Sequence, residues 1–233
     1  MTTIAIMQPY FFPYLGYFQL LASVDRFVIL DDVNMINRGW VNRNRILVNG
    51  EAHTISIPLI GNSQNKLICE LSIFDESKWR EKTLKTITQS YSRAPYFRSV
   101  MSLIEEIFGY NESSLDKFLL HSLGKFVDYL GISVEIISSS RKYGNNHLRA
   151  QDRIIDICQK EQSQNYINPI GGVDLYSKES FAKHELCLHF LKMREIEYKQ
   201  FQSKHLPFLS IVDVCMFNSS KELTALLAEK ELC

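Results

Sequence analysis

Residues 38–45 form the densest group of potential ligand-binding side chains in the chain, Arg-Gly-Trp-Val-Asn-Arg-Asn-Arg. Arginine binds phosphate through two parallel hydrogen bonds, asparagine recognises polar groups, and tryptophan stacks on a base or sugar face. A solvated surface more typically mixes lysine with glutamate and lacks tryptophan. We therefore predict that this segment binds a phosphorylated substrate. Its predicted binding residues are Arg38, Trp40, Asn42, Arg43, Asn44 and Arg45.

Two adjacent acids, Asp31 and Asp32, follow the apolar run at residues 26–30. That run is rich in β-branched and aromatic residues, which is typical of a buried strand. Paired carboxylates at the end of a strand can bind Mg²⁺, or orient and deprotonate an amine. Aspartate is also common in turns, which is the alternative interpretation. We predict a catalytic role for this pair.

The segment Met-Gln-Pro-Tyr-Phe-Phe-Pro-Tyr-Leu-Gly-Tyr-Phe at residues 7–18 joins a predicted strand, residues 4–7, to a predicted helix, residues 14–24. A helix that follows a parallel strand presents free backbone N–H groups and a positive dipole end to phosphate. The spacing of Gly16 and Tyr17 after a proline resembles the loop-to-helix junction of HIGH-type nucleotidyltransferases and adenylate-forming ligases. Tyrosine replaces their histidine and does not change charge near neutral pH.

Five residues of this junction are predicted to contact substrate. Gln8 and Tyr17 would steady the reacting carbonyl or phosphate, and we count both as catalytic candidates. Gly16 would allow a close approach of neighbouring backbone. Tyr10 and Tyr14 would line the phosphate end of the site. The alternative is that the aromatic residues belong to the hydrophobic core.

Further polar residues lie after later predicted strands or on helices. A run of serines that follows a strand can hold an anion in its backbone N–H groups. Paired glycines indicate a close backbone approach or a plain turn. An acid inside an apolar run is usually paired or functional. These additional predicted binding residues are Lys85, Tyr91, Ser138, Ser139, Arg153, Gly171, Gly172, Tyr176 and Asp213.

Short strands alternate with helices along the chain, which predicts an α/β fold with a mainly parallel, Rossmann-like N-terminal sheet and a more helical C-terminal part. An Asn-Gly turn at residues 49–50 predicts a hairpin. A boundary near residues 72–78 would separate a phosphate-binding part, 1–75, from a part that completes the cleft, 76–233, unless the chain is one continuous domain. Helices are expected at residues 14–24, 78–90, 100–108, 114–130, 148–160, 179–184, 209–217 and 222–230, and strands at 4–7, 26–30, 46–48, 52–59, 134–137, 165–168 and 186–190.

Composition narrows the classes of function. The chain has 26 basic and 26 acidic residues, so its net charge is zero and a broadly basic nucleic-acid surface is not indicated. Five cysteines without a paired motif are typical of reduced, mostly buried thiols in a cytoplasmic protein. No HxH or HExxH arrangement occurs, so we predict no zinc site. A signal peptide and a membrane-inserted segment are likewise not expected.

Three of these runs resemble the WbqC-like protein family: residues 7–20, the Leu-Asp-Asp-Val run at 30–33, and the Arg-rich run at 38–46. Further similarities lie around Lys85 and Tyr91, Ser138 and Ser139, Arg153, the glycine pair with Tyr176, and Asp213. The resemblance implies a bacterial cytosolic protein of O-antigen, lipopolysaccharide or other cell-surface polysaccharide biosynthesis. Such proteins accompany the making of N-acylated amino sugars.

Three functions remain open at this stage. The first is a transferase that N-acylates or N-aminoacylates, for example by glycyl transfer, a dTDP- or UDP-linked deoxyamino sugar. It would use acyl-CoA or aminoacyl-tRNA as donor. Its arginines would hold phosphates, Trp40 would stack on a ring, and Asp31 or Asp32 would handle the ammonium. The second is an ATP- and Mg²⁺-dependent adenylate-forming ligase or nucleotidyltransferase. The third is a non-catalytic sugar-nucleotide-binding protein.

Overall fold

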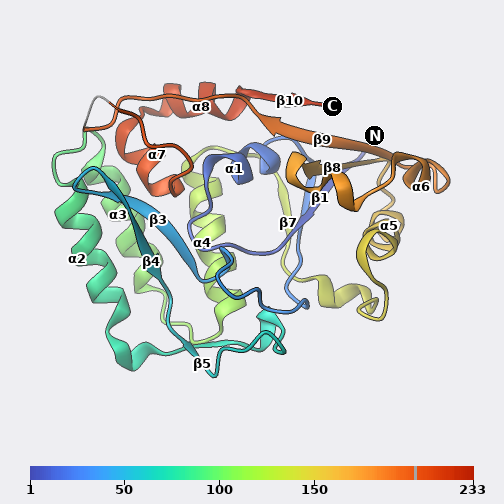
Figure 1. Ribbon diagram of the computed structural model, residues 1–233, viewed down its shortest axis with the longest axis horizontal. Helices are drawn as coiled ribbons and strands as arrows, with labels where there is room; N and C mark the ends of the chain where they lie inside the picture. Colours follow the sequence, from blue (N-terminus) through green and yellow to red (C-terminus); the bar gives the residue numbers. More distant parts are fainter. Residues whose placement is uncertain (202–203) are drawn as a thin grey trace.

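A six-stranded sheet forms the centre of the protein in a computed structural model that describes residues 1–201 and 204–233 (Figure 1). The strands lie in the order β10-β9-β8-β1-β2-β7, and every neighbouring pair is parallel except the pair between β9 and β10. The predicted α/β class with a mainly parallel sheet is therefore confirmed. The strands are β1 (Thr3–Met7), β2 (Arg26–Ile29), β7 (Glu135–Ile137), β8 (Asn165–Pro169), β9 (Cys187–Met193) and β10 (Lys230–Leu232).

Alternating side chains of the central strands divide the core into two layers. Successive residues of a strand point to opposite faces of the sheet. Ile4 and Ile6 of β1 therefore join one cluster, whereas Ala5 joins the other. The first cluster packs against α5 (Ala150–Lys160) and α6 (Lys178–Ala182). Both faces of the sheet are covered, as parallel sheets require.

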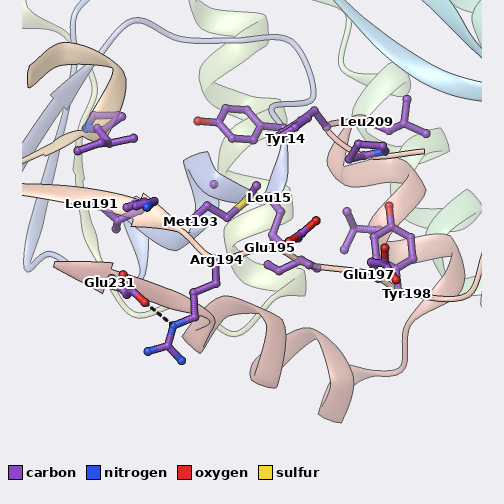
Figure 2. A pocket seen from close by; sticks show the side chains of 18 of the residues that line it. Tyr14, Leu15, Leu191, Met193, Arg194, Glu195, Glu197, Tyr198, Leu209 and Glu231 are labelled. Carbon is purple, nitrogen blue, oxygen red and sulfur yellow. Dashed lines mark hydrogen bonds and ion pairs between the residues drawn. The ribbon is translucent and has the colours of Figure 1, made fainter. Parts of the chain in front are cut away.

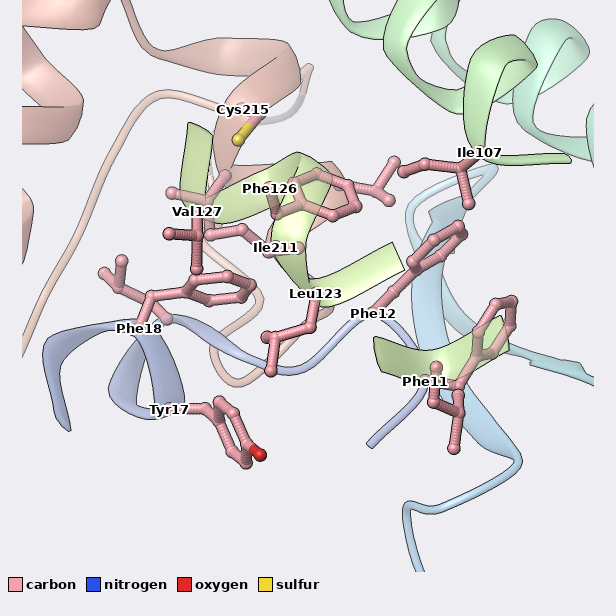
Figure 3. Packing of buried hydrophobic residues seen from close by; sticks show 14 of the residues in the cluster. Phe11, Phe12, Tyr17, Phe18, Ile107, Leu123, Phe126, Val127, Ile211 and Cys215 are labelled. Carbon is pink, nitrogen blue, oxygen red and sulfur yellow. The ribbon is translucent and has the colours of Figure 1, made fainter. Parts of the chain in front are cut away.

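The opposite face carries the larger cluster. Helices α1 (Leu15–Leu21), α4 (Leu115–Tyr129), α7 (Ile211–Phe217) and α8 (Ser220–Ala228) contribute to it, and α2 (Trp79–Tyr91) and α3 (Phe97–Gly109) pack farther out. Figure 3 shows Phe12 and Phe18 from the first loop and helix beside Phe126 of α4 and Ile211 of α7. The Phe12 and Phe126 rings meet edge to face with centroids 5.5 Å apart. The aromatic residues around the first helix are thus largely core residues.

A hairpin of β3 (Arg43–Val48) and β4 (Glu51–Ser56) lies apart from the main sheet, as Figure 1 shows. Its turn is the predicted Asn49-Gly50 pair, with φ of 50° and 86°. Two positive φ values in succession are typical of a tight hairpin turn, which favours asparagine and glycine. A short pair, β5 (Leu59–Ile60) with β6 (Ser72–Ile73), follows.

The main sheet takes strands from both sides of residue 75, and the predicted boundary near residues 72–78 stays a prediction beside its alternative of one continuous domain. One feature differs from the expectations. The last predicted helix ends early, and residues 230–232 form β10 against β9 because main-chain pairing there outweighs local helix propensity. None of the helices in the described ranges is long and apolar enough to cross a membrane.

Candidate functional site

The carboxyl ends of the parallel strands meet along one edge of the sheet. From β1 the chain adds β2 and then β7 on one side, and it crosses to the other side to add β8 and β9. The order of strands therefore reverses between β1 and β8. In open α/β sheets, ligands bind outside the carboxyl ends of the strands at such a reversal.

A pocket of about 860 Å³ lies at this reversal (Figure 2). Its walls come from the beginning of α1, the end of β8, the end of β9, and the irregular segment that leads into α7. Small-molecule sites typically have volumes of about 300–1,000 Å³ and mostly apolar walls. The pocket residues include Tyr14, Leu15, Gly16, Ile170, Gly171, Leu191, Met193, Glu195, Tyr198, His205, Phe208, Leu209 and Val214.

The predicted arginine-rich segment adjoins this pocket through one residue. The Arg45 guanidinium donates a hydrogen bond from Nη2 to the carbonyl of Phe208 at 3.3 Å, and Phe208 lines the pocket. The same guanidinium lies over the Trp40 ring, 5.4 Å from its centroid. Trp40 is 39% exposed. A cation and an exposed aromatic face thus lie next to the rim of the pocket.

Other residues of the segment have structural partners. The Arg43 guanidinium donates to the carbonyls of Gly39, at 3.1 Å, and Arg38. The Asn42 amide donates to the carbonyl of Ile57 at 2.9 Å. Arg38 itself is exposed and has a left-handed backbone with φ of 61°. Substrate binding therefore fits Arg45 and Arg38 better than it fits Arg43 or Asn42.

Asn44 also has structural partners. Its side chain is 4% exposed, and its amide donates to the carbonyls of Phe11 and Phe12 at 3.0 and 2.8 Å. These bonds supply donors to two backbone carbonyls of the loop that joins β1 to α1, because buried carbonyls need a hydrogen-bond donor. Asn44 anchors that loop, and its predicted substrate contact stays a prediction.

The acidic pair is held inside the protein, at the ends of β2 and β7. Asp31 is fully buried and accepts both hydroxyl hydrogen bonds of the neighbouring serines, at 2.8 Å from Ser139 and 3.2 Å from Ser140. It also accepts from the Ser140 backbone N–H at 3.0 Å and pairs with Arg141 at 3.3 Å. With its lone pairs occupied, this carboxylate has no free oxygen for a substrate amine.

Asp32 is engaged in the same network. Its Oδ1 lies 2.5 Å from Nη2 of Arg153, and the side chains of this pair are 6% and 7% exposed. The Ser140 hydroxyl also donates to it. Arg153 in turn donates from Nε to Asn145 at 3.1 Å. In this structure Asp31, Asp32 and Arg153 hold one another within a buried network, and their predicted roles toward a substrate stay predictions.

The junction before α1 also departs from its predicted chemistry. Tyr17 is 2% exposed, and its hydroxyl donates to the backbone carbonyl of Gln8 at 2.9 Å. Burial raises the pKa of Tyr17 well above its usual value. This hydroxyl ties the helix to the end of β1 and has no access to a ligand. Gln8 itself is half-buried, and its predicted catalytic role stays a prediction.

Gly16 makes room for an aromatic ring. A Cβ atom at this position would lie 2.4 Å from a ring carbon of Tyr14. The expected close approach is therefore to a side chain instead of neighbouring backbone. Figure 2 shows the Tyr14 ring extended along the pocket, and burial raises the pKa of its hydroxyl. Tyr10 packs on Tyr17 with ring centroids 5.5 Å apart.

Asp213 has a structural environment too. This fully buried carboxylate accepts from the hydroxyls of Tyr91 and Tyr198, at 2.7 and 2.6 Å, and from the Gln200 amide at 2.7 Å. Burial raises the pKa of Asp213, although the three donors oppose that shift. The Tyr91 hydroxyl also accepts from the backbone N–H of Leu47. Tyr91 and Asp213 thus join α2, β3 and α7, and their predicted substrate contacts stay predictions.

The remaining predicted residues are dispersed. Gly172 allows the Asn168 amide to approach, since a Cβ atom there would lie 2.0 Å from Nδ2, and Tyr176 packs beside it. Gly171 lines the pocket. Lys85 and Ser138 are exposed on α2 and after β7, and neither residue lines the pocket. The structure thus brings Tyr14, Gly16 and Gly171 together at the pocket, with Arg45 and Trp40 next to it.

Several pocket residues were not predicted. His205 lines the pocket, and its Nε2 atom is buried without a hydrogen-bond partner. Phe208 is 60% exposed with a left-handed φ of 56°. These two residues stand in the run His-Leu-Pro-Phe-Leu at 205–209, which has neither helix nor strand periodicity, so the sequence carried no signal that assigned them to a site. Within the described part of the chain, no group of three or more acids, histidines and cysteines is arranged to hold a metal ion.

The comparisons with known proteins agree with the resemblance. The sequence model of the WbqC-like protein family matches residues 8–225, which is most of the chain. This chain belongs to the WbqC-like protein family. It is also 26% identical over 227 residues to "Uncharacterized protein Rv1507c" of Mycobacterium tuberculosis, a match that covers 95% of this chain and 96% of the relative. No solved structure matches.

Proposed function

We propose that this WbqC-like protein is a transferase of cell-surface polysaccharide synthesis, acting in the cytoplasm on a nucleotide-linked deoxyamino sugar. It would N-acylate or N-aminoacylate the sugar amine. The observation that carries the proposal is the position of the pocket, at the reversal of strand order and joined at its rim to Arg45 and Trp40. Membership of the WbqC-like family supports the choice of pathway.

The rim offers separate places for the parts of a sugar nucleotide. The Arg45 guanidinium keeps its Nε atom buried and unpartnered, so it has donor capacity beyond its bond to Phe208. Arginine holds diphosphate by charge-assisted hydrogen bonds. The exposed Trp40 ring can stack on a base. With the diphosphate on Arg45, the attached amino sugar would enter at Phe208, which lies on both the rim and the pocket wall.

The reaction forms one bond and breaks one. The amine nitrogen attacks the acyl carbonyl carbon, an amide bond forms, and the bond from that carbon to the donor's sulfur or oxygen breaks. The amine loses a proton, and the leaving thiol or alcohol gains one. Histidine is the side chain that most often moves such a proton. In this pocket the candidate is His205, because it lines the pocket and its Nε2 atom lacks a protein partner, whereas Asp31 and Asp32 are not among the lining residues.

Mass spectrometry tests the proposal. The full chain is incubated with a dTDP- or UDP-4-amino sugar and, in separate reactions, acyl-CoA, aminoacyl-tRNA, or free acid with ATP and Mg²⁺. We expect one donor class to give a sugar nucleotide heavier by one acyl group. His205→Gln should abolish the product while the melting temperature stays near that of the wild type. A complete absence of product with every donor and both nucleotides would overturn the proposal.

Two alternatives predict different results. An adenylate-forming ligase would require ATP to raise the melting temperature in the presence of Mg²⁺. The burial of Tyr17 weakens this alternative, because the residue in the histidine position has no access to phosphate. A non-catalytic sugar-nucleotide-binding protein would bind the sugar nucleotide, yield no product with any donor, and still complement a deletion strain when it carries His205→Gln.

A further inference from the structure

The inner wall of the pocket is aliphatic. Leu15, Leu191, Leu209 and Val214 are each 5% exposed or less and come from four different segments of the chain. Met193 adds a flexible thioether, as Figure 2 shows near Leu15. Burial of apolar ligand surface against such a wall is favourable, whereas an unpaired polar group there would be costly.

The mouth of the pocket exposes further apolar surface. Ile170 is 40% exposed and Phe208 is 60% exposed, although both line the pocket. Phe208 also has a φ of 56°, a region that is unfavourable for a bulky residue. Backbone strain of this kind occurs preferentially at ligand sites. The exposed Phe208 ring and the exposed Ile170 side chain therefore offer apolar surface to a ligand at the mouth.

The charges of the pocket argue against phosphate inside it. Glu195, Glu197 and Glu231 lie along its rim, and all three are acidic. Two basic residues, Lys192 and Arg194, also line the pocket, and Arg194 is already paired, at 3.5 Å with Glu229 and 3.2 Å with Glu231. Like charges repel, so a diphosphate fits the Arg45 side of the rim and an uncharged group fits the interior.

We infer that the pocket binds the aliphatic chain of an acyl thioester donor. This inference rests on the proposed function and names its donor class, a saturated acyl group of several carbons instead of an aminoacyl group. The acyl carbon would pass to the sugar amine as its bond to sulfur breaks, and the thiol would leave with a proton. The volume of about 860 Å³ leaves room for the chain and for part of the sugar.

Calorimetric titration of the full chain with acetyl-, butyryl-, hexanoyl- and octanoyl-coenzyme A tests the inference. A buried methylene contributes enough to lower the dissociation constant roughly fourfold. We expect this gain for each added methylene until the pocket is full. A parallel titration with octanoate shows whether the pocket prefers the free fatty acid or the thioester, since octanoate and octanoyl-coenzyme A carry the same chain. Weaker binding of octanoate than of octanoyl-coenzyme A is the expected result, and the reverse order would overturn the thioester part of the inference.

Three variants locate the binding site. Gly171→Leu adds a side chain at the pocket where a Cβ meets nothing within 4 Å, so it should remove the dependence on chain length without unfolding the protein. Gly109→Leu at the exposed end of α3 has an equally open position and is the matched control. Phe208→Gly relieves the left-handed backbone while removing apolar surface. It should weaken octanoyl binding about tenfold or more while the melting temperature stays constant or rises.

The outcomes separate this inference from the proposed function. A dissociation constant that does not change with chain length overturns the inference, even if acetyl or glycyl transfer to the sugar occurs. A fourfold gain per methylene that Gly171→Leu leaves intact also overturns it, because the chain then binds elsewhere. A gain that Gly171→Leu abolishes, without transfer to any amino sugar, supports the acyl pocket and overturns the proposed function.

Discussion

The ion pair between Asp32 and Arg153 offers a sharp test of the structural role given to the acidic pair. Arg153→Met would leave the Asp32 carboxylate, 6% exposed, with the Ser140 hydroxyl as its remaining side-chain donor. Breaking a buried ion pair from one side typically costs about 3–5 kcal/mol in the free energy of unfolding. Asp32→Leu should cost a similar amount, because the Arg153 cation would then be buried with only neutral partners.

The double variant should be far less destabilised than the two single variants together. It removes both charges and leaves mainly the Asn145 side chain without its donor, which costs about 1–3 kcal/mol. The coupling energy of the cycle is therefore expected to be at least about 3 kcal/mol. Urea unfolding followed by circular dichroism measures all four proteins, with Arg194→Met as a control at an exposed ion pair worth about 0–1 kcal/mol.

Small and additive costs would refute this reasoning. If each single variant lost less than about 1 kcal/mol and the double variant lost their sum, the pair would be hydrated and weakly coupled. Asp32 would then be free for chemistry, as the sequence first suggested. A loss of sugar acylation in a stably folded Asp32→Asn variant would point the same way.

Three further predictions concern other parts of the protein. Asp213→Asn should lower the free energy of unfolding by about 1–3 kcal/mol. At least one of the three groups that donate to the Asp213 carboxylate would then face the NH2 group of asparagine, which cannot accept. Burial raises the pKa of Asp213 in the folded protein above its value in the unfolded chain, so the wild type gains stability as pH falls from the folded pKa toward the unfolded one. The difference in free energy of unfolding between wild type and variant should therefore grow from pH 7 to about pH 4. Equal differences at the two pH values would contradict this. Iodoacetamide near neutral pH should alkylate exposed Cys187 and Cys233, as read by mass spectrometry. It should spare Cys69, because burial raises the pKa of that thiol to about 11 and little thiolate is present. Rapid modification of Cys69 would contradict this. Gly16→Ala should displace the Tyr14 ring and lower the melting temperature, whereas an unchanged melting temperature would show that the ring moves freely.

The sequence predicted most of the sheet and helices because their signals are local. The first strand and the first helix are marked by apolar runs, and the Asn49-Gly50 turn by two residues that tolerate positive φ. The last strand, β10, was not predicted, because its pairing partner, β9, lies far away in the chain. A short polar segment such as residues 230–232 carries no local sign of that pairing.

The candidate site was harder to predict for a physical reason. A polar side chain that satisfies a distant backbone group has the same sequence appearance as one that binds a ligand. Asn44 bonds to carbonyls 32 and 33 residues away, and Tyr91 bonds to Asp213 across 122 residues. The pocket wall contributed by residues 194–198, 205 and 207–209 lacks helix or strand periodicity, so His205 and Phe208 gave no pattern that could assign them to a site.

A crystal soaked with a dTDP- or UDP-4-amino sugar tests the central claim most directly. We predict that the diphosphate lies against Arg45, that the base stacks on Trp40, and that the amino sugar enters the pocket beside Phe208, with its amine directed to His205. Sugar nucleotide bound instead at the carboxyl ends of β2 and β7, against Asp31 and Asp32, would contradict the account.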